Sequence, residues 1–176
     1  MRKMIFGLLI CIVLVFASVL PVTGELQKIK TEDAIEKTNV IVDRISLPPP
    51  MFIDMILEES ICRRMSVRSF TTEDVTDEEL STILWAAYGV TENGNRSIFN
   101  PDGTYSTIIY VIRSDATYKY FPEDHSLSLF KSGNYMHLGQ YDDASIKFGL
   151  IWDMDVESEE LRGMADIGMV CQNIIF

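Results

Sequence analysis

The residues best suited to binding chemistry lie in the stretch CRRMSVRSF, residues 62–70. Its Arg64, Ser66 and Arg68 alternate along the chain, and alternate side chains of an extended backbone point to the same side. Two guanidinium groups and a hydroxyl on one side form a cradle for an anion, because a planar guanidinium bonds phosphate oxygens bidentately. The alternative is that these arginines form surface ion pairs with acidic residues of segment 54–59. The spacing leaves both interpretations open.

The charge of the whole chain limits its partners. The 176 residues include 15 Lys+Arg and 26 Asp+Glu, so the formal net charge is −11. Nucleic acids and anionic lipid surfaces both require a basic protein surface. The composition therefore excludes nucleic acid as a partner and leaves a membrane only through the N-terminal segment. A hydrophobic content of 47% in this length suits one domain with a core.

Other reactive side chains are expected to have structural roles. Cys62 and Cys171 fall in predicted amphipathic helices, where we expect them to be small buried apolar residues. The cysteines and the two histidines are far apart in sequence, so no metal site is predicted. His125 is expected in a turn or on the surface. The aromatic residues Trp85 and Tyr88 are expected in the core.

The N-terminal 24 residues have the pattern of a signal peptide. Basic residues at positions 2 and 3 precede an uncharged run of 17 residues, and small residues follow before Glu25. The run also approaches the length of a bilayer span, so an uncleaved membrane anchor is the alternative. Both place the remaining chain outside the cytoplasm, secreted or membrane-anchored. Residues 25–50, which are charged and end in SLPPP, are expected to be a linker, with a short helix over 32–42 as one option.

Three helices are predicted after the linker. The first covers residues 52–62, where apolar residues recur at mostly helical spacing. The second follows a capping box formed by Thr76 and Glu79 and ends at Gly89. The third covers residues 157–176, with acidic residues at its start that suit the helix dipole.

Apolar, β-branched and aromatic runs predict four strands between the second and third helices. They cover residues 107–113, 117–121, 126–130 and 145–152, and PEDH joins the middle two as a hairpin. Helices that flank a set of strands indicate an α+β fold.

These motifs together resemble the FMN-dependent nitroreductase family, and within it the branch of dehydrogenases that oxidise peptide azolines. RRMSVRSF resembles the Arg-x-Ser-x-Arg-x-Phe opening of that branch, and ILWAAYG resembles the end of its next helix. ADIGMVCQNIIF resembles its acidic-x-Gly-x-x-x-Gln-Asn helix. The similarity runs from about Glu58 to Phe176. It implies a nitroreductase-like fold, with a central antiparallel-rich sheet flanked by helices, and an FMN site at a homodimer interface.

The resemblance implies cofactor-binding roles for seven residues. Arg64 and Ser66 are expected at the FMN phosphate or ribityl chain. Arg68 is expected at the pyrimidine edge of the flavin, where a fixed cation stabilises the negative charge of the reduced ring. The other four match family segments near the flavin, and the asparagine among them offers a donor to a flavin carbonyl: Arg96, Asn100, Asp166 and Gly168. No side chain is assigned a catalytic role, because hydride passes through flavin N5.

The implied function is an exported FMN-dependent oxidoreductase acting on a small molecule. NAD(P)H or another reduced donor would supply electrons to an unidentified acceptor, or an azoline-like substrate would be oxidised. The family continues beyond Gln172-Asn173 with segments absent from this sequence. Residues 51–176 are therefore expected to be a partial flavin-binding domain, in a homodimer or with a complementing chain. The alternative is a non-catalytic truncated remnant or binding protein that pairs with another chain.

Overall fold

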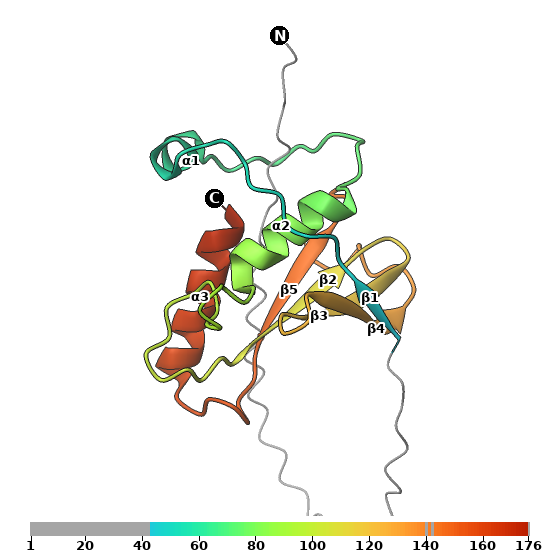
Figure 1. The fold of residues 1–176 in the computed structure, drawn as a ribbon. Coiled ribbons are helices and arrows are strands. Elements are labelled where there is room, and N and C mark those ends of the chain that lie inside the picture. The colour runs from blue at the N-terminus through green and yellow to red at the C-terminus, as the bar shows by residue number, and fades with distance from the viewer. Residues whose placement is uncertain (1–42, 140, 142, 176) are drawn as a thin grey trace, which may run out of the picture.

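A five-stranded antiparallel sheet lies at the centre of the computed structural model, with strand order β1-β4-β3-β2-β5 (Figure 1). The model describes residues 43–139, 141 and 143–175. Its strands are β1 (Arg44–Ser46), β2 (Thr107–Ile112), β3 (Ala116–Phe121), β4 (Ser126–Ser132) and β5 (Lys147–Trp152). The four strands predicted from the sequence and their hairpin are confirmed, and the fold is α+β as expected.

The strand β1 lies within the region that the sequence analysis treated as a linker, residues 25–50. It pairs with β4, and Arg44 is opposite Ser128. The backbone N–H of Leu47 then donates to the carbonyl of His125 at 3.1 Å. The predicted signal or anchor segment and the optional helix over 32–42 lie outside the described residues. Within the described residues, no helix has both the length and the hydropathy needed to cross a bilayer.

Three helices accompany the sheet: α1 (Leu57–Arg63), α2 (Asp77–Tyr88) and α3 (Glu160–Ile175). The predicted capping box of α2 is confirmed. Thr76 N donates to Glu79 Oε2 at 2.9 Å, and Glu79 N donates to Thr76 Oγ1 at 3.2 Å. These bonds satisfy two of the donors that a helix start leaves free. The helix ends at Gly89, as expected, where Gly89 N donates to Trp85 O.

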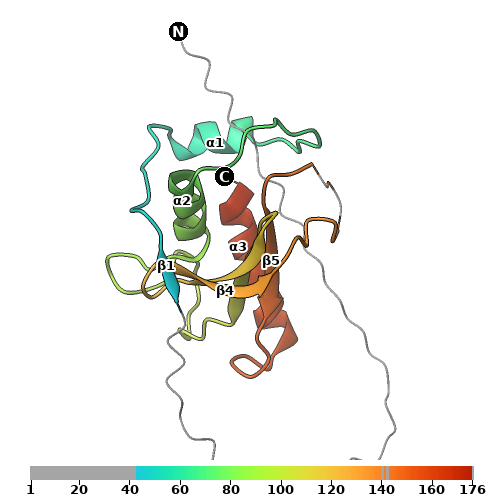
Figure 2. The ribbon, with the colours of Figure 1, turned by 90° about the vertical axis from the view of Figure 1, so that its right-hand side faces the viewer.

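The helix α1 differs from its prediction in length and in burial. It has no buried residue, and Phe52, which precedes it, is 84% exposed. Cys62 is also exposed, so the prediction that it is buried is wrong. The reason is that α1 lies above α2 and away from the sheet (Figure 2), where its apolar side has nothing to cover it among the described residues. Cys171 in α3 is half-buried.

The core lies between one face of the sheet and helices α2 and α3. Leu80 and Leu84 of α2 pack with the inward side chains of β2 and β5 and with Val170 of α3. Tyr88 is buried among them, which confirms its predicted core position. Trp85 is half-buried, and its indole N–H donates to the carbonyl of Val90.

A close approach fixes α3 against β5. A Cβ on Gly163 would lie 2.3 Å from Nε1 of Trp152, so this helix position tolerates no side chain while the indole stays in place. The indole is held there because its N–H donates to the carbonyl of Glu157 at 2.7 Å. The start of α3 is therefore positioned by one glycine and one tryptophan.

Candidate functional site

The basic stretch leaves α1 in an extended conformation. Arg64 has φ −57° and ψ 125°, and Arg64, Ser66 and Arg68 are all exposed. The neighbouring Arg63 forms an i,i+4 ion pair with Glu59. Within the part of the chain that the structure describes, no carboxylate pairs with Arg64 or Arg68. Among the described residues, the structure shows the surface ion pair at Arg63 and none at Arg64 or Arg68, whose guanidinium groups stay available.

Helix α3 has an open position at Gly168. Figures 1 and 2 both show the C-terminal end of α3 beneath α1. Gly168 of this helix is exposed, and apart from its chain neighbours and the adjacent backbone of its own helix no atom lies within 4 Å of the place where a Cβ would be. A flat ring could therefore approach the backbone of α3 closely at Gly168.

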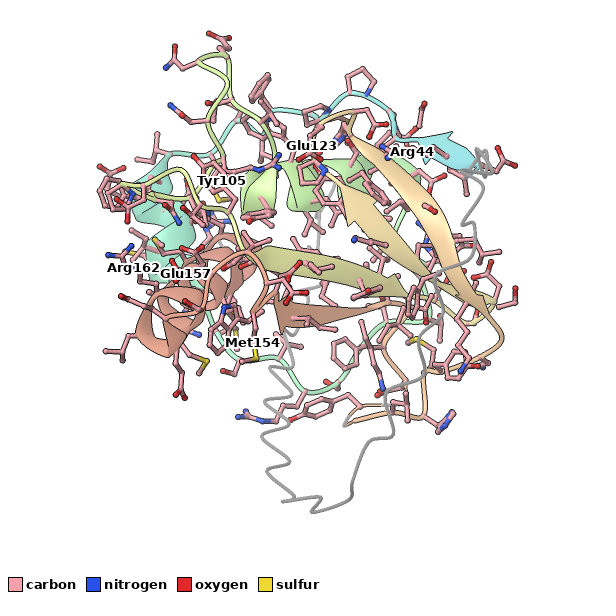
Figure 3. The ribbon with its side chains drawn as sticks, turned by 90° about the horizontal axis from the view of Figure 1, so that it is seen from below. Arg44, Tyr105, Glu123, Met154, Glu157 and Arg162 are labelled. Carbon is pink, nitrogen blue, oxygen red and sulfur yellow. The ribbon has the colours of Figure 1, made fainter. Side chains whose placement is uncertain are left out.

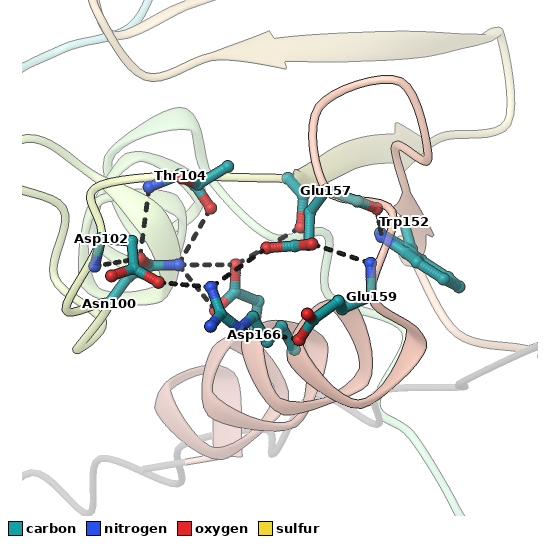
Figure 4. Close-up of polar contacts among 9 residues, drawn as sticks. Asn100, Asp102, Thr104, Trp152, Glu157, Glu159 and Asp166 are labelled. Carbon is teal, nitrogen blue, oxygen red and sulfur yellow. Dashed lines mark hydrogen bonds and ion pairs between the residues drawn. The ribbon is translucent and has the colours of Figure 1, made fainter.

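Asn100 and Asp166 are joined directly by hydrogen bonds (Figure 4). Asn100 Nδ2 donates to the two carboxylate oxygens of Asp166 at 3.2 and 3.1 Å, and to the carbonyl of Thr104 at 2.9 Å. Asn100 Oδ1 accepts from the backbone N–H groups of Asp102 and Thr104. Asp166 is buried, and the hydroxyl of Ser106 also approaches it. Both amide N–H groups of Asn100 are used within the protein, so no N–H is left for a flavin carbonyl.

Arg162 fastens the same loop to the start of α3. Its guanidinium pairs with Asp102 of the loop and, at 3.1 Å, with Glu159. Glu157 lies 3.9 Å away on the same side (Figure 4). Exposed pairs of this kind contribute little individually. Their role here is to hold the segment that carries Asn100 over the buried carboxylate of Asp166.

Arg96 lies inside the protein rather than on an open surface. Its side chain is 11% exposed, and its guanidinium stands 5.1 Å from the ring of Tyr88 and 5.5 Å from the ring of Tyr105. It also pairs with Glu123 of the β3–β4 turn; Figure 3 labels Tyr105 and Glu123. Burial raises the pKa of Glu123, but its own backbone N–H and the Arg96 guanidinium outweigh that effect, so this pKa lies below its usual value. Arg96 thus joins the loop to the hairpin.

Tyr88 contributes a neutral hydroxyl to this buried region. Burial raises the pKa of Tyr88 to about 12. The hydroxyl accepts a hydrogen bond from the backbone N–H of Thr107 at 3.2 Å, at the first residue of β2. The ring is therefore held as a wall beside Arg96 and does not titrate near neutral pH.

His125 forms contacts that the sequence did not indicate. It occupies the β3–β4 turn with φ 47°, which confirms the predicted turn position, and it is half-buried. Its Nε2 lies 2.7 Å from Ser81 Oγ and its Nδ1 lies 2.9 Å from the hydroxyl of Tyr120. Ser81 Oγ also donates to the carbonyl of Pro48 at 2.5 Å. Because Ser81 is fully buried, this hydroxyl–imidazole pair is a structural connection and not a nucleophile open to substrate.

The predicted site residues therefore form two groups. One is exposed and without internal partners among the described residues: Arg64, Ser66, Arg68 and Gly168. The other is internal and bonded to the protein itself: Arg96, Asn100 and Asp166. A cofactor that approaches from outside would meet the first group, and the second group would position the loop and helix behind it. Among the described residues, no cluster of His, Cys, Asp and Glu side chains could hold a metal ion.

Known proteins resemble this chain in sequence and in fold. A sequence model described as Nitroreductase family matches residues 61–176. The chain is 38% identical over 92 residues to Putative nitroreductase MJ1384 of Methanocaldococcus jannaschii. The aligned residues make up 48% of this chain and 46% of that protein. The chain therefore spans about half the length of this curated relative. The crystal structure of a putative nitroreductase from Ralstonia eutropha JMP134 superposes with a TM-score of 0.68 at 26% identity, over 75% of this chain and 69% of that one. The chain therefore belongs to the Nitroreductase family.

Proposed function

We propose that this chain forms the flavin-binding part of an FMN-dependent oxidoreductase that acts on a small molecule. The observation that carries the proposal is the contrast between adjacent arginines. Arg63 is neutralised by Glu59, whereas Arg64 and Arg68 are exposed without a carboxylate among the described residues. In a chain of net charge −11, two free guanidinium groups beside a hydroxyl are suited to a phosphate.

The charge of the exposed residues suits FMN, and Gly168 offers open space. Arg64 and Ser66 would hold the phosphate or the ribityl chain, and Arg68 would lie at the pyrimidine edge of the ring. The open position at Gly168 leaves room for the ring against α3. When bound, FMN would supply hydride transfer at its N5 between NAD(P)H or another reduced donor and an acceptor, or from an azoline-like substrate. The cation of Arg68 would favour the reduced flavin by stabilising its negative charge.

The internal group of residues would act by positioning. Asn100 and Asp166 hold the loop to α3, and Arg96 holds the same loop to the hairpin. Direct contact of these three with FMN, as the family resemblance implies, stays a prediction. It would require Asn100 to exchange one of its present partners for the flavin.

A homodimer is part of the proposal. Large apolar side chains are exposed on and just before α1 and near the start of α3, and exposed apolar side chains that gather on a surface mark interaction sites. They include Ile56, Leu57, Ile61, Leu161 and Met164. A second copy of the chain, or a complementing chain, would bury these side chains. Export of the protein, as a secreted or anchored form, rests on the pattern of residues 1–24.

An FMN titration with two neighbouring arginine variants tests the proposal. Arg64→Ala should weaken FMN binding by about 1.5–3 kcal/mol, the contribution of a charge-assisted hydrogen bond, which is about 10- to 150-fold in Kd. Arg63→Ala removes the same charge one residue away and should change Kd less than about threefold, because Arg63 already has a partner. Flavin absorbance and fluorescence follow the titration. Equal losses in both variants would reduce the effect to net charge, and no binding by the folded protein would favour the non-catalytic alternative.

A further inference from the structure

The turn that follows α2 presents one asparagine side chain to solvent. Residues 90–96 form a tight loop that is closed by a β-bridge between Val90 and Arg96. Thr91 braces the loop, because its backbone N–H and its hydroxyl both donate to the carbonyl of Asn95, at 2.7 and 3.1 Å. Gly94 has the positive φ of 80° that this turn requires. The backbone of Asn95 is therefore held in place, while its side chain is exposed.

The side-chain amide of Asn95 has no role in the fold. Within the described residues this amide has no hydrogen-bond partner. The next side chain lies on the inside, since Arg96 is 11% exposed and pairs with Glu123. In Figure 2 the chain that follows α2 projects outward from the helices. A group attached to Asn95 would therefore extend into solvent and would leave the contacts of Arg96 intact.

Ser97 carries a hydroxyl that the folded chain does not use. The backbone of Ser97 is bonded, because its N–H donates to the carbonyl of Gly89 at 3.0 Å. Its Oγ, however, is buried and has no hydrogen-bond partner among the described residues. A buried hydroxyl without a partner costs free energy that an alanine would avoid. The packing of the fold therefore does not explain a hydroxyl at this position.

Asn95, Arg96 and Ser97 form the acceptor pattern of N-linked glycosylation, Asn-x-Ser with a residue other than proline in the middle. The other asparagines of the chain do not begin this pattern: Asn39, Asn93, Asn100, Asn134 and Asn173. The pattern alone is short. Here it coincides with an exposed amide that has no internal role and with a hydroxyl that the fold leaves unpaired.

We propose that Asn95 is the acceptor of an N-linked glycan, a proposal that rests on the proposed export of the chain. Its Nδ2 forms a bond to the anomeric carbon of a sugar. The bond from that carbon to a phosphate oxygen of a lipid-linked carrier breaks, the amide gives up one proton to a base, and the lipid phosphate leaves as an anion. The carrier and the transferase belong to the membrane that the chain crosses. Because the hydroxyl of Ser97 is buried in the fold, the transfer precedes the packing of this loop.

Mass spectrometry of the full chain, produced in its host of origin with residues 1–24 present, tests the proposal. Protein recovered from outside the cytoplasm should exceed its polypeptide mass by a whole number of sugar residues, and peptide fragmentation should locate them on Asn95. Asn95→Gln and Ser97→Ala should both abolish the added mass. Ser97→Thr keeps the hydroxyl and should retain it. The matched control Asn93→Gln changes an exposed asparagine of the same turn and should also retain it.

Export and modification fail in different ways in this experiment. Exported protein with an unmodified Asn95 would overturn the glycan and leave export standing, whereas protein found only in the cytoplasm would overturn both. An added mass that survives Ser97→Ala would assign the modification to a different chemistry.

The unused hydroxyl has a test of its own, in protein made in a bacterial cytoplasm without glycosylation enzymes. There Ser97→Ala should have a thermal midpoint no lower than that of the unaltered chain. A lower midpoint would give this hydroxyl a structural role and remove it from the argument.

Discussion

Asn100 and Asp166 are 66 positions apart in the chain, yet the amide of one donates to both carboxylate oxygens of the other. The bond joins an irregular loop to the middle of α3. A buried carboxylate without donors is costly, because it loses water and gains nothing in return. The amide of Asn100 therefore stabilises Asp166 and fixes the loop with the same group.

Removal of that amide should destabilise the fold. Asn100→Ala is expected to lower the free energy of unfolding by about 1–3 kcal/mol, the cost of leaving a buried polar group without its partner. Asn95→Ala, at an exposed position of the same loop, should change it by less than about 0.5 kcal/mol. Urea unfolding measured by circular dichroism compares the two. Similar values for both variants would show that the contact with Asp166 contributes no stability.

Two glycines of α3 should respond oppositely to alanine. Gly163→Ala places a methyl group against the indole of Trp152 and should destabilise the protein by about 1–3 kcal/mol, as overpacking does. Gly168→Ala meets open space and should stabilise it by about 0.5–1 kcal/mol through helix propensity. Thermal unfolding of both variants gives the sign. A stabilised Gly163→Ala would mean that Trp152 moves aside at little cost.

Acidification should weaken the fold through His125. Ser81 donates to Pro48, so the imidazole N–H at Nε2 donates to Ser81 and Nδ1 accepts from Tyr120. Burial lowers the pKa of His125 below its usual 6.5. The unfolded chain therefore binds the proton more readily, so stability present at pH 7.5 is lost as the pH falls below 6.5 toward the folded-state pKa. Protonation would also put a proton on Nδ1, which could then no longer accept the hydrogen bond from Tyr120. The charged groups that act on Tyr120 are Arg96, Glu123 and Asp124.

Urea unfolding at pH 7.5, 6.5 and 5.5 checks this dependence. His125→Asn is the suitable variant, because asparagine tolerates the positive φ of this turn. The fall in stability over this range should be smaller in the variant than in the unaltered protein. An identical fall in both would assign the pH dependence to other groups.

Arg68→Ala should lower the reduction potential of bound FMN. Loss of a fixed cation at the pyrimidine edge removes stabilisation of the reduced ring, and a change of about 1.4 kcal/mol corresponds to roughly 30 mV for two electrons. Spectroelectrochemical titration measures the shift, with Arg63→Ala as the variant of equal charge. An unaltered potential would place Arg68 away from the ring.

The elements that the sequence predicted well are those with complete local signals. The second helix carries its own capping box and closing glycine, and β2 is a continuous apolar β-branched run. The strand β1 has no such signal. Its three residues RIS pair only because β4 and the turn at His125 provide partners 80 to 84 positions later.

In the candidate site, too, the features that could be predicted are those that depend on neighbouring residues in the sequence. The basic stretch with Arg64, Ser66 and Arg68 could be identified from the sequence, since it lies within five residues, and its role as an anion site stays a prediction. The bonds of Asn100 to Asp166 and of Ser81 to His125 could not, because each joins elements that only the folded sheet and helices bring together. The burial of α1 was overestimated because helical spacing identifies an apolar side but not its partner.

The attachment of β1 also determines how this domain would respond to a pull on its N-terminal segment. All three residues of β1 are exposed, and Ile45 is 52% exposed, so the strand contributes no buried side chain. Tension would reach β1 first and then the bond between Pro48 and Ser81, which fastens the chain to α2. The three residues of β1 can therefore separate from β4 under tension while the core keeps its packing. A force applied to the N-terminal segment by a membrane or a moving partner would separate β1 before it pulled on the basic stretch.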